Sequence, residues 1–364
     1  MSALVDEIMS TALSGIAPSE NAFPLLEVSG APRERGRAHG EHFAERIRTT
    51  FDFYMHDLFS GSPLSADQIE ARARGIEPIG QRYAPAITQE IRGIAEGSGL
   101  EPWQIFALNA RTEILNARID ECSALYFADS AILGQNWDWV EPLEPLCILI
   151  RHRHEDGFER LVFSEPGMVA KIGMNSAGLG ICLNILFAPH DLSGLPVHML
   201  IGALLDCRDF ESGRDLLENC GRGKASHLLL ANGEGSAVSA EFYGDDLHLL
   251  SPQDGLLLHT NHCVALGEAG RLPDLANSCA RFDRLVQKTT ASERDLATAK
   301  SILLSVDGGE DSIMREYRPQ SFLGTHRVGS CASVLMELDR GRLHIKRGPG
   351  AEDDYQSIDL SQAA

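Results

Sequence analysis

The stretch Asp120–Trp139, DECSALYFADSAILGQNWDW, limits the possible folds more than any other part of the chain. From Cys122 onward, side chains alternate between two faces, which predicts a β-strand over residues 122–128. After a short turn, a second strand-like run begins at Ile132. If the two runs pair as a hairpin, Asp138 returns to the start of the first strand. The sequence therefore predicts a carboxylate beside the thiol of Cys122.

A cysteine is more often a packing residue than a nucleophile, because its thiol behaves as a small hydrophobic group. On that interpretation Cys122 belongs to the core, and Trp137 and Trp139 only pack around it. The crowding of polar side chains along the second run, including Gln135 and Asp138, favours a chemical role for this cysteine instead.

The charge balance of the chain excludes several classes of function. The 364 residues contain 32 Lys and Arg against 52 Asp and Glu, which gives a formal net charge of -20. Such a surface repels phosphate backbones and anionic membranes, so we expect no nucleic-acid partner and no membrane partner. Electrostatic steering would attract cationic compounds, which makes amine-bearing molecules candidate substrates.

The N-terminal residues and the cysteines indicate a reduced, intracellular protein. Residues 1–18 carry two acidic side chains and lack a basic leader region, which predicts a short amphipathic helix and not a secretion signal. No apolar run approaches the roughly 18 residues of a spanning helix. We therefore expect a cytoplasmic protein. Its eight cysteines lack CxxC spacing, so the sequence predicts neither a disulfide framework nor a zinc knuckle.

The order of the predicted elements indicates an α+β fold. Helices are predicted over about 36–59, 65–97, 102–117, 196–206, 209–220, 275–289 and 292–305, with interruptions at Pro78 and Pro85. Further strands are predicted over 24–28, 146–152, 160–165, 168–174, 178–184, 226–232, 236–243, 246–250, 255–260, 331–338 and 342–347. Grouped strands with helices grouped around them favour a layered α+β body over an alternating βαβ one.

Three further polar clusters are candidates for a chemical role. The segment 259–263, HTNHC, leaves a predicted strand, and there the Asn261 amide can donate to a developing oxyanion. Arg327 precedes the last hairpin and can bind a carboxylate through two parallel hydrogen bonds, although a lone arginine is more often a surface ion-pair residue. The charges of the segment 111–113, RTE, also fit a solvated helix face.

The sequence predicts no metal and no cofactor. His259 and His262, like His152 and His154, lack a third carboxylate ligand at a recognised spacing. The segment 178–180, GLG, lacks the third glycine of a dinucleotide-binding loop.

Several of these segments together resemble the isopenicillin N acyltransferase family, the acyl-coenzyme A:6-aminopenicillanate acyltransferases and their hydrolase relatives within the N-terminal-nucleophile hydrolases. The matching segments are RTEIL at 111–115, the Cys122 segment with GQNWDW at 134–139, KIGMNSAGLG at 171–180, HTNHC at 259–263, LPD at 272–274 and the Arg327 segment running into SVLMELDRGRL. Their shared order and spacing carry the resemblance, which extends over most of the chain. It implies a four-layer αββα sandwich.

The resemblance also implies that the precursor cuts itself between Glu121 and Cys122. The mainly helical fragment 1–121 and the fragment 122–364 would then remain associated as one packed domain. Family members commonly have glycine before the nucleophile, whereas Glu121 carries a Cβ that fits a strained backbone less readily. We nevertheless expect cleavage.

The catalytic residues implied by the resemblance are Cys122 as nucleophile, Asp138 as supporting aspartate, Asn261 as oxyanion donor and Arg327 as active-site arginine. A cysteine thiol has a reference pKa of about 8.5 and needs a base near neutral pH. Once Cys122 is a chain terminus, its own α-amino group, with a reference pKa of roughly 7.7 to 8.0, can be that base.

The sequence therefore predicts a self-processing cysteine amidohydrolase that cleaves a linear N-acyl amide or a small peptide-like amide through an acyl-thioester on Cys122. Hydrolysis is preferred because nothing in the sequence indicates an acyl-coenzyme A pocket. Two alternatives remain open. One is an acyl-coenzyme A-dependent N-acyltransferase, and the other is an uncleaved, inactive binding protein of the same fold.

Overall fold

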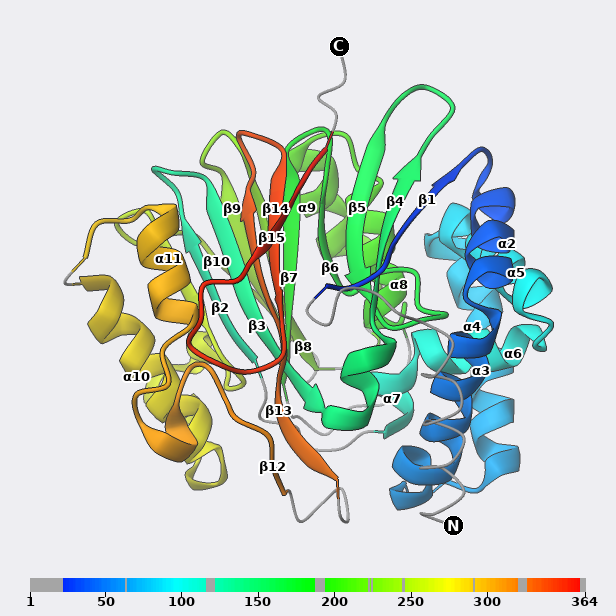
Figure 1. The fold of residues 1–364 in the computed structure, drawn as a ribbon, viewed down its shortest axis with the longest axis horizontal. Helices are drawn as coiled ribbons and strands as arrows, with labels where there is room; N and C mark the ends of the chain where they lie inside the picture. The colour runs from blue at the N-terminus through cyan, green and yellow to red at the C-terminus, as the bar shows by residue number, and fades with distance from the viewer. Residues whose placement is uncertain are drawn as a thin grey trace.

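Two β-sheets face each other, and helices cover both outer faces (Figure 1). The computed structural model describes residues 22–360 except 63, 116–121, 187–193, 222, 224, 244–245, 291 and 320–325. Helices α8 and α9 pack on one sheet, while α10 and α11 pack on the other. The predicted four-layer αββα sandwich of the α+β class is confirmed.

The helices lie close to their predicted positions. They are α2 (Pro32–His42), α3 (Ala44–Phe53), the π-helical turn η1 (Tyr54–Leu58), α4 (Ala66–Tyr83), α5 (Pro85–Ser98), α6 (Pro102–Asn109), α7 (Arg111–Leu115), α8 (Val197–Leu205), α9 (Phe210–Asn219), α10 (Ala276–Thr290) and α11 (Leu296–Leu303). Short helical turns are η2 (Phe59–Gly61), η3 (Glu141–Leu146), η4 (Val264–Gly270), η5 (Pro273–Leu275) and η6 (Gly309–Asp311).

Within the described residues, one sheet has eight strands in the order β1-β4-β5-β6-β7-β8-β9-β10, and the other has the order β11-β2-β3-β13-β14-β15 with β12 beside β13. The strands of the first are β1 (Leu25–Ser29), β4 (Ile148–Arg153), β5 (Glu159–Ser164), β6 (Ile172–Asn175), β7 (Leu179–Ile185), β8 (Ser226–Asn232), β9 (Ala237–Tyr243) and β10 (Asp246–Leu250). Those of the second are β2 (Cys122–Phe127), β3 (Ile132–Val140), β11 (Leu256–His259), β12 (Arg318–Pro319), β13 (Arg327–Glu337), β14 (Arg342–Arg347) and β15 (Gln356–Asp359).

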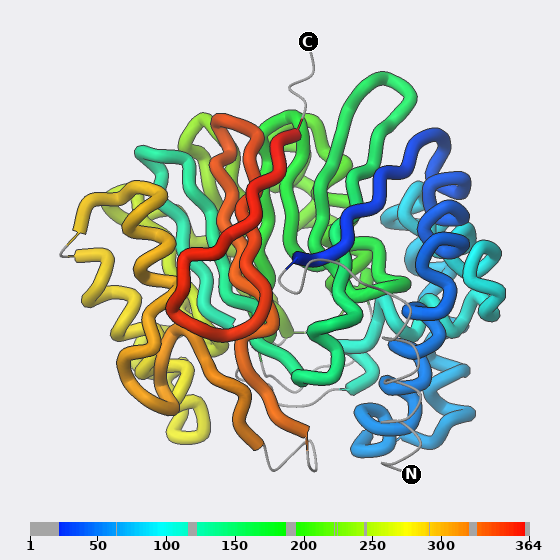
Figure 2. Tube along the Cα trace, viewed as in Figure 1, coloured from blue at the N-terminus to red at the C-terminus, as the bar shows by residue number. Residues whose placement is uncertain are grey.

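The first third of the chain is helical, as predicted, and gathers on one side of the sandwich (Figure 2). The predicted break at Pro85 is confirmed, because α5 begins there, whereas the predicted break at Pro78 is wrong, because Pro78 lies inside α4. Helices α2 and α5 pack closely enough that a Cβ on Gly93 would lie 2.1 Å from the Arg33 carbonyl oxygen. Among the described residues, no helix has both the length and the apolar character needed to cross a membrane.

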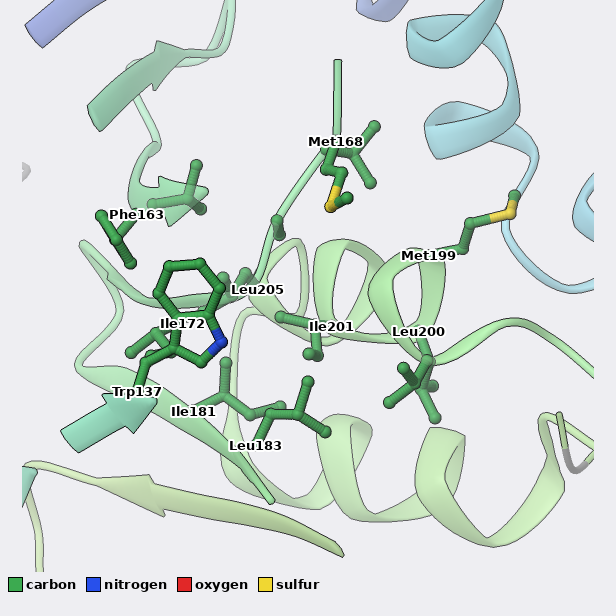
Figure 3. Close-up of a cluster of buried hydrophobic side chains, with 14 of the residues drawn as sticks. Trp137, Phe163, Met168, Ile172, Ile181, Leu183, Met199, Leu200, Ile201 and Leu205 are labelled. Carbon is green, nitrogen blue, oxygen red and sulfur yellow. The ribbon is translucent and has the colours of Figure 1, made fainter. Parts of the chain in front are cut away.

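Strand β2 is buried on both faces, which explains its nearly continuous apolar sequence. Ala124 and Tyr126 belong to the main core, whereas Leu125 and Phe127 pack with side chains of α10 and α11. The end of β3 reaches the main core as well, since the Trp137 ring lies among apolar side chains of the eight-stranded sheet (Figure 3). The hairpin that carries Cys122 is therefore held from both sides.

Candidate active site

The β2–β3 hairpin places Asp138 next to the start of β2, as the predicted hairpin pairing required. Cys122 pairs with Trp137 in the antiparallel register, so Asp138 is one residue beyond the partner of Cys122. Cys122, Asp138 and Asn261 all line one small pocket. Three of the four predicted catalytic residues are therefore brought together. Glu121, which belongs to the predicted cleavage site, lies outside the described residues.

The backbone of Cys122 is fixed on both sides by buried polar groups. Its N–H donates to Asn261 Oδ1 at 2.9 Å, and its carbonyl oxygen accepts from Arg281 Nη1 at 2.6 Å. Arg281 Nη1 also donates to Ser123 Oγ at 3.0 Å. Cys122 itself is only 5% exposed. The nucleophile candidate is thus held in one position before any substrate arrives.

The Asn261 side chain is oriented by its neighbours. Arg281 Nη2 donates to Asn261 Oδ1 at 2.9 Å, and Asn261 Nδ2 donates to the Ile185 carbonyl oxygen at 3.0 Å. Because a guanidinium can only donate, the oxygen of Asn261 must face Arg281. Among the described residues this leaves one N–H of Nδ2 without an acceptor, and that N–H can donate to a substrate oxygen.

Asp138 is a buried carboxyl group with one oxygen in use. Oδ1 accepts from Ser330 Oγ at 2.6 Å across the β3–β13 pairing, next to a bulge between Ser330 and Ala332. Oδ2 is buried and has no hydrogen-bond donor among the described residues. Burial raises the pKa of Asp138 to about 6, although Arg315, Arg281 and the Ser330 hydrogen bond each act to lower it.

A carboxylate behind the site holds the loop that carries Asn261. Glu241 Oε1 accepts from His259 Nε2 at 2.8 Å and from the Val264 N–H at 2.6 Å, while Oε2 accepts from the Ala265 N–H at 2.9 Å and from Cys263 Sγ at 3.1 Å. Burial alone would raise the pKa of Glu241, but these donors, led by His259, lower it to about 2. Glu241 therefore fixes both ends of the loop.

Part of the pocket wall is cationic. Arg111 and Lys171 line it, and both contact Glu165 Oε2, at 3.2 Å and 2.6 Å respectively. The Arg111 guanidinium also stacks on the Trp139 ring, 4.2 Å from its centroid. The interpretation of 111–113 as a solvated helix face is wrong, because all of α7 is buried.

Arg327 is not brought to the pocket. It lies at the exposed start of β13, where its guanidinium donates to Glu141 in a bidentate pair. Besides Arg111, which lines the pocket, two arginines act on Asp138, namely Arg281 and Arg315, and the sequence singled out neither of them. The sequence does contain one indication of a role for Arg281. It shares the buried face of α10 with Leu285, and a charged residue on such a face needs a polar partner.

Comparison with known sequences identifies proteins to which this chain is similar. Residues 127–340 match the family described as acyl-coenzyme A:6-aminopenicillanic acid acyl-transferase. The chain is 27% identical, over 71% of its length and 75% of the other protein, to the acyl-coenzyme A:6-aminopenicillanic-acid-acyltransferase 40 kDa form of Emericella nidulans. It is 24% identical to the protein dcd1A of Dictyostelium discoideum, over 56% of this chain and 54% of that protein.

Solved structures give weaker similarities. A variant of the conjugated bile acid hydrolase from Clostridium perfringens aligns with a TM-score of 0.48 and 16% identity, over 68% of this chain and 94% of the other. Penicillin V acylase from Agrobacterium tumefaciens aligns with a TM-score of 0.47 and 16% identity, over 66% of this chain and 86% of the other.

Proposed function

The chain belongs to the acyl-coenzyme A:6-aminopenicillanic acid acyl-transferase family, and from this premise we propose that it is a self-processing cysteine amidohydrolase of the N-terminal-nucleophile type. One observation carries the proposal: the backbone nitrogen of Cys122, and not only its thiol, has a dedicated buried acceptor in Asn261 Oδ1. After a cut before Cys122, this nitrogen becomes the α-amino group. The base that activates the thiol would therefore be positioned in advance.

Self-cutting uses the same atoms as catalysis. The Cys122 sulfur attacks the Glu121 carbonyl carbon, the amide nitrogen gains the thiol proton, and the C–N bond breaks to leave a thioester between residues 121 and 122. Water then hydrolyses this thioester, which releases the Glu121 carboxylate and regenerates the Cys122 thiol beside a free amine. The two fragments, of 121 and 243 residues, would stay associated, because the main core contains side chains from both.

Turnover repeats this chemistry on an external amide. The Cys122 α-amine accepts the thiol proton, the thiolate attacks the substrate carbonyl, and the amine returns the proton to the leaving nitrogen. The remaining N–H of Asn261 Nδ2 would donate to the oxyanion, a contribution that typically amounts to about 2.7 to 4 kcal/mol. Oδ2 of Asp138, which has no donor among the described residues, would accept from the α-ammonium and hold it against the sulfur.

Intact mass spectrometry of the purified protein tests the proposal. Wild type should give two masses that correspond to 121 and 243 residues, whereas Cys122→Ala should give one undivided mass and no turnover. Cys207→Ala is the matched control, because Cys207 is partly exposed and lies outside the pocket. A panel of N-acyl amides, each tested with and without an amine acceptor, then measures the reaction.

The outcomes separate the candidate functions. Acid release that depends on Cys122 supports hydrolysis, whereas acceptor-dependent amide formation faster than acid release would show acyl transfer. A wild-type protein that stays undivided and turns over no amide, yet still binds ligands, would instead be an uncleaved binding protein.

A further inference from the structure

Lys171 is a fully buried ammonium group in the same pocket as Cys122. It immediately precedes β6, and its Nζ lies 2.6 Å from Glu165 Oε2 and 4.1 Å from the centroid of the Trp137 ring. The surroundings of that ring are apolar, as Figure 3 shows for Phe163 and Ile172. In the described part of the chain, Glu165 is the one carboxylate that forms an ion pair with Lys171.

The charge of Lys171 is only partly balanced by Glu165. The same carboxylate also faces Arg111 and accepts a hydrogen bond from Tyr54 at 2.6 Å. Burial and the Arg111 charge lower the pKa of Lys171 to about 8, despite the opposing effect of Glu165. An ammonium that is destabilised in this way gains most from a second anion.

Two other titratable neighbours of Lys171, His198 and Cys147, do not supply that anion. Burial, reinforced by the nearby Lys171 and Arg111 charges, holds the pKa of His198 well below its usual value, so this imidazole is neutral near pH 7. Burial raises the pKa of Cys147 well above its usual value, so its thiol is protonated. Asp138 also lines the pocket, but it accepts from Ser330 and forms no ion pair with Lys171 among the described residues, so a molecule that enters the pocket can supply the second negative charge.

We propose that Lys171 binds a carboxylate of the substrate, and that the enzyme therefore prefers an amide with an anionic group. This inference rests on the proposed function, because it concerns the substrate of the Cys122 pocket. It reverses the expectation from composition. The net charge of -20 would attract amine-bearing compounds to the surface, but the pocket wall itself presents a buried cation.

Two pairs of matched amides test the preference and locate the carboxylate. Glutaryl p-nitroanilide against pentanoyl p-nitroanilide places the anion on the acyl part. N-phenylacetylglycine against N-phenylacetylpropylamine places it on the amine part. The protein variants are Lys171→Met, Lys171→Gln and Lys171→Arg, with Lys288→Met as a control at a surface ion pair.

In wild type, kcat/KM should favour the anionic member of one pair by about tenfold or more, and the difference should lie mainly in KM. Ten-fold corresponds to about 1.4 kcal/mol of binding. Lys171→Met and Lys171→Gln should lose this preference, Lys171→Arg should keep part of it, and Lys288→Met should keep all of it. Lys171→Gln preserves the test if the apolar methionine destabilises the fold, because the glutamine amide can still donate a hydrogen bond to Glu165.

A second readout does not depend on turnover. Hexanoate should protect Cys122 from iodoacetamide better than hexanamide does, and this difference should vanish in Lys171→Met. Equal protection by the two probes, or an anionic preference that survives in Lys171→Met, would overturn the inference. If turnover depends on Cys122 but shows no preference for anionic amides, this inference is rejected and the proposed function stands. If both self-cutting and turnover fail, the proposed function itself is rejected.

Discussion

Replacing Arg281 with lysine should damage this enzyme far more than the same replacement at Arg327. The Arg281 guanidinium donates to the Cys122 carbonyl oxygen, to Ser123 Oγ and to Asn261 Oδ1 from a fully buried position. A lysine keeps the charge, but it offers its donors from one point and cannot reproduce the planar fork. Arg327 forms an exposed pair with Glu141, where a lysine can take its place.

The size of the difference follows from burial. A hydrogen bond to a charged group contributes about 1.5 to 3 kcal/mol, so the loss of two at Arg281 would cost roughly 3 to 6 kcal/mol of stability if water does not replace them. A displacement of the nucleophile by about 1 Å is enough for a 100-fold loss in rate, which equals about 2.7 kcal/mol. The Arg327 pair is half exposed and contributes at most about 1 kcal/mol.

The assay compares self-cutting by intact mass and kcat/KM on one amide for both variants, together with their melting temperatures. We expect Arg281→Lys to fold, to cut itself slowly and to lose about 100-fold in kcat/KM, while Arg327→Lys changes kcat/KM by less than about fivefold. The reasoning fails if Arg281→Lys cuts and turns over at the wild-type rate, or if Arg327→Lys proves the more damaging change.

Two further predictions concern acid groups at the site. Because burial raises the pKa of Asp138 to about 6, log kcat/KM should fall more steeply below about pH 6. Ser330→Ala should move this break to higher pH, because it removes a hydrogen bond that favours the ionised carboxylate. A break that stays in place in Ser330→Ala would contradict this prediction. Because the folded-state pKa of Glu241 is lowered from 4.5 to about 2, its ionised form contributes about 3 kcal/mol of stability above pH 4.5, which is lost as the pH falls through 2. Glu241→Gln should therefore lower the free energy of unfolding at pH 7 by about that amount, and urea titrations that show no difference at pH 7 would refute it.

The sequence predicted most of the fold because local patterns determine most of it. The period of two predicted the strands β2 and β3, and their expected pairing as a hairpin placed Asp138 beside the start of β2. The helix over 36–59 was less well predicted, since it divides into α2 and α3 where Phe43 leaves the helical conformation. Proline was also a poor guide inside α4, because tertiary packing tolerates Pro78 there.

The site was predicted less completely, because burial of a charge depends on partners that are distant in sequence. Arg111 looked like a surface residue until β5 and its following loop supplied Glu165. Arg281 gave a weak local signal, but its acceptors are about 160 and 20 residues away in the chain. Arg327 was favoured by its position before the last hairpin and by the family resemblance, and neither feature reports which way the guanidinium points.

The buried polar contacts around Cys122 do more than position single side chains, because they join the two sheets. Asn261 connects the end of β11 with Ile185 of β7, Gln135 of β3 pairs with both backbone groups of Leu183, and Glu241 of β9 binds His259 of β11. Apolar packing between sheets does not specify one alignment, whereas a buried hydrogen-bond donor without its acceptor costs about 1 to 3 kcal/mol. Any sliding of one sheet over the other would break several of these contacts at once. The geometry of Cys122 is therefore tied to the packing of the whole sandwich, and in the proposed mechanism the same contacts hold the backbone nitrogen that would become the base.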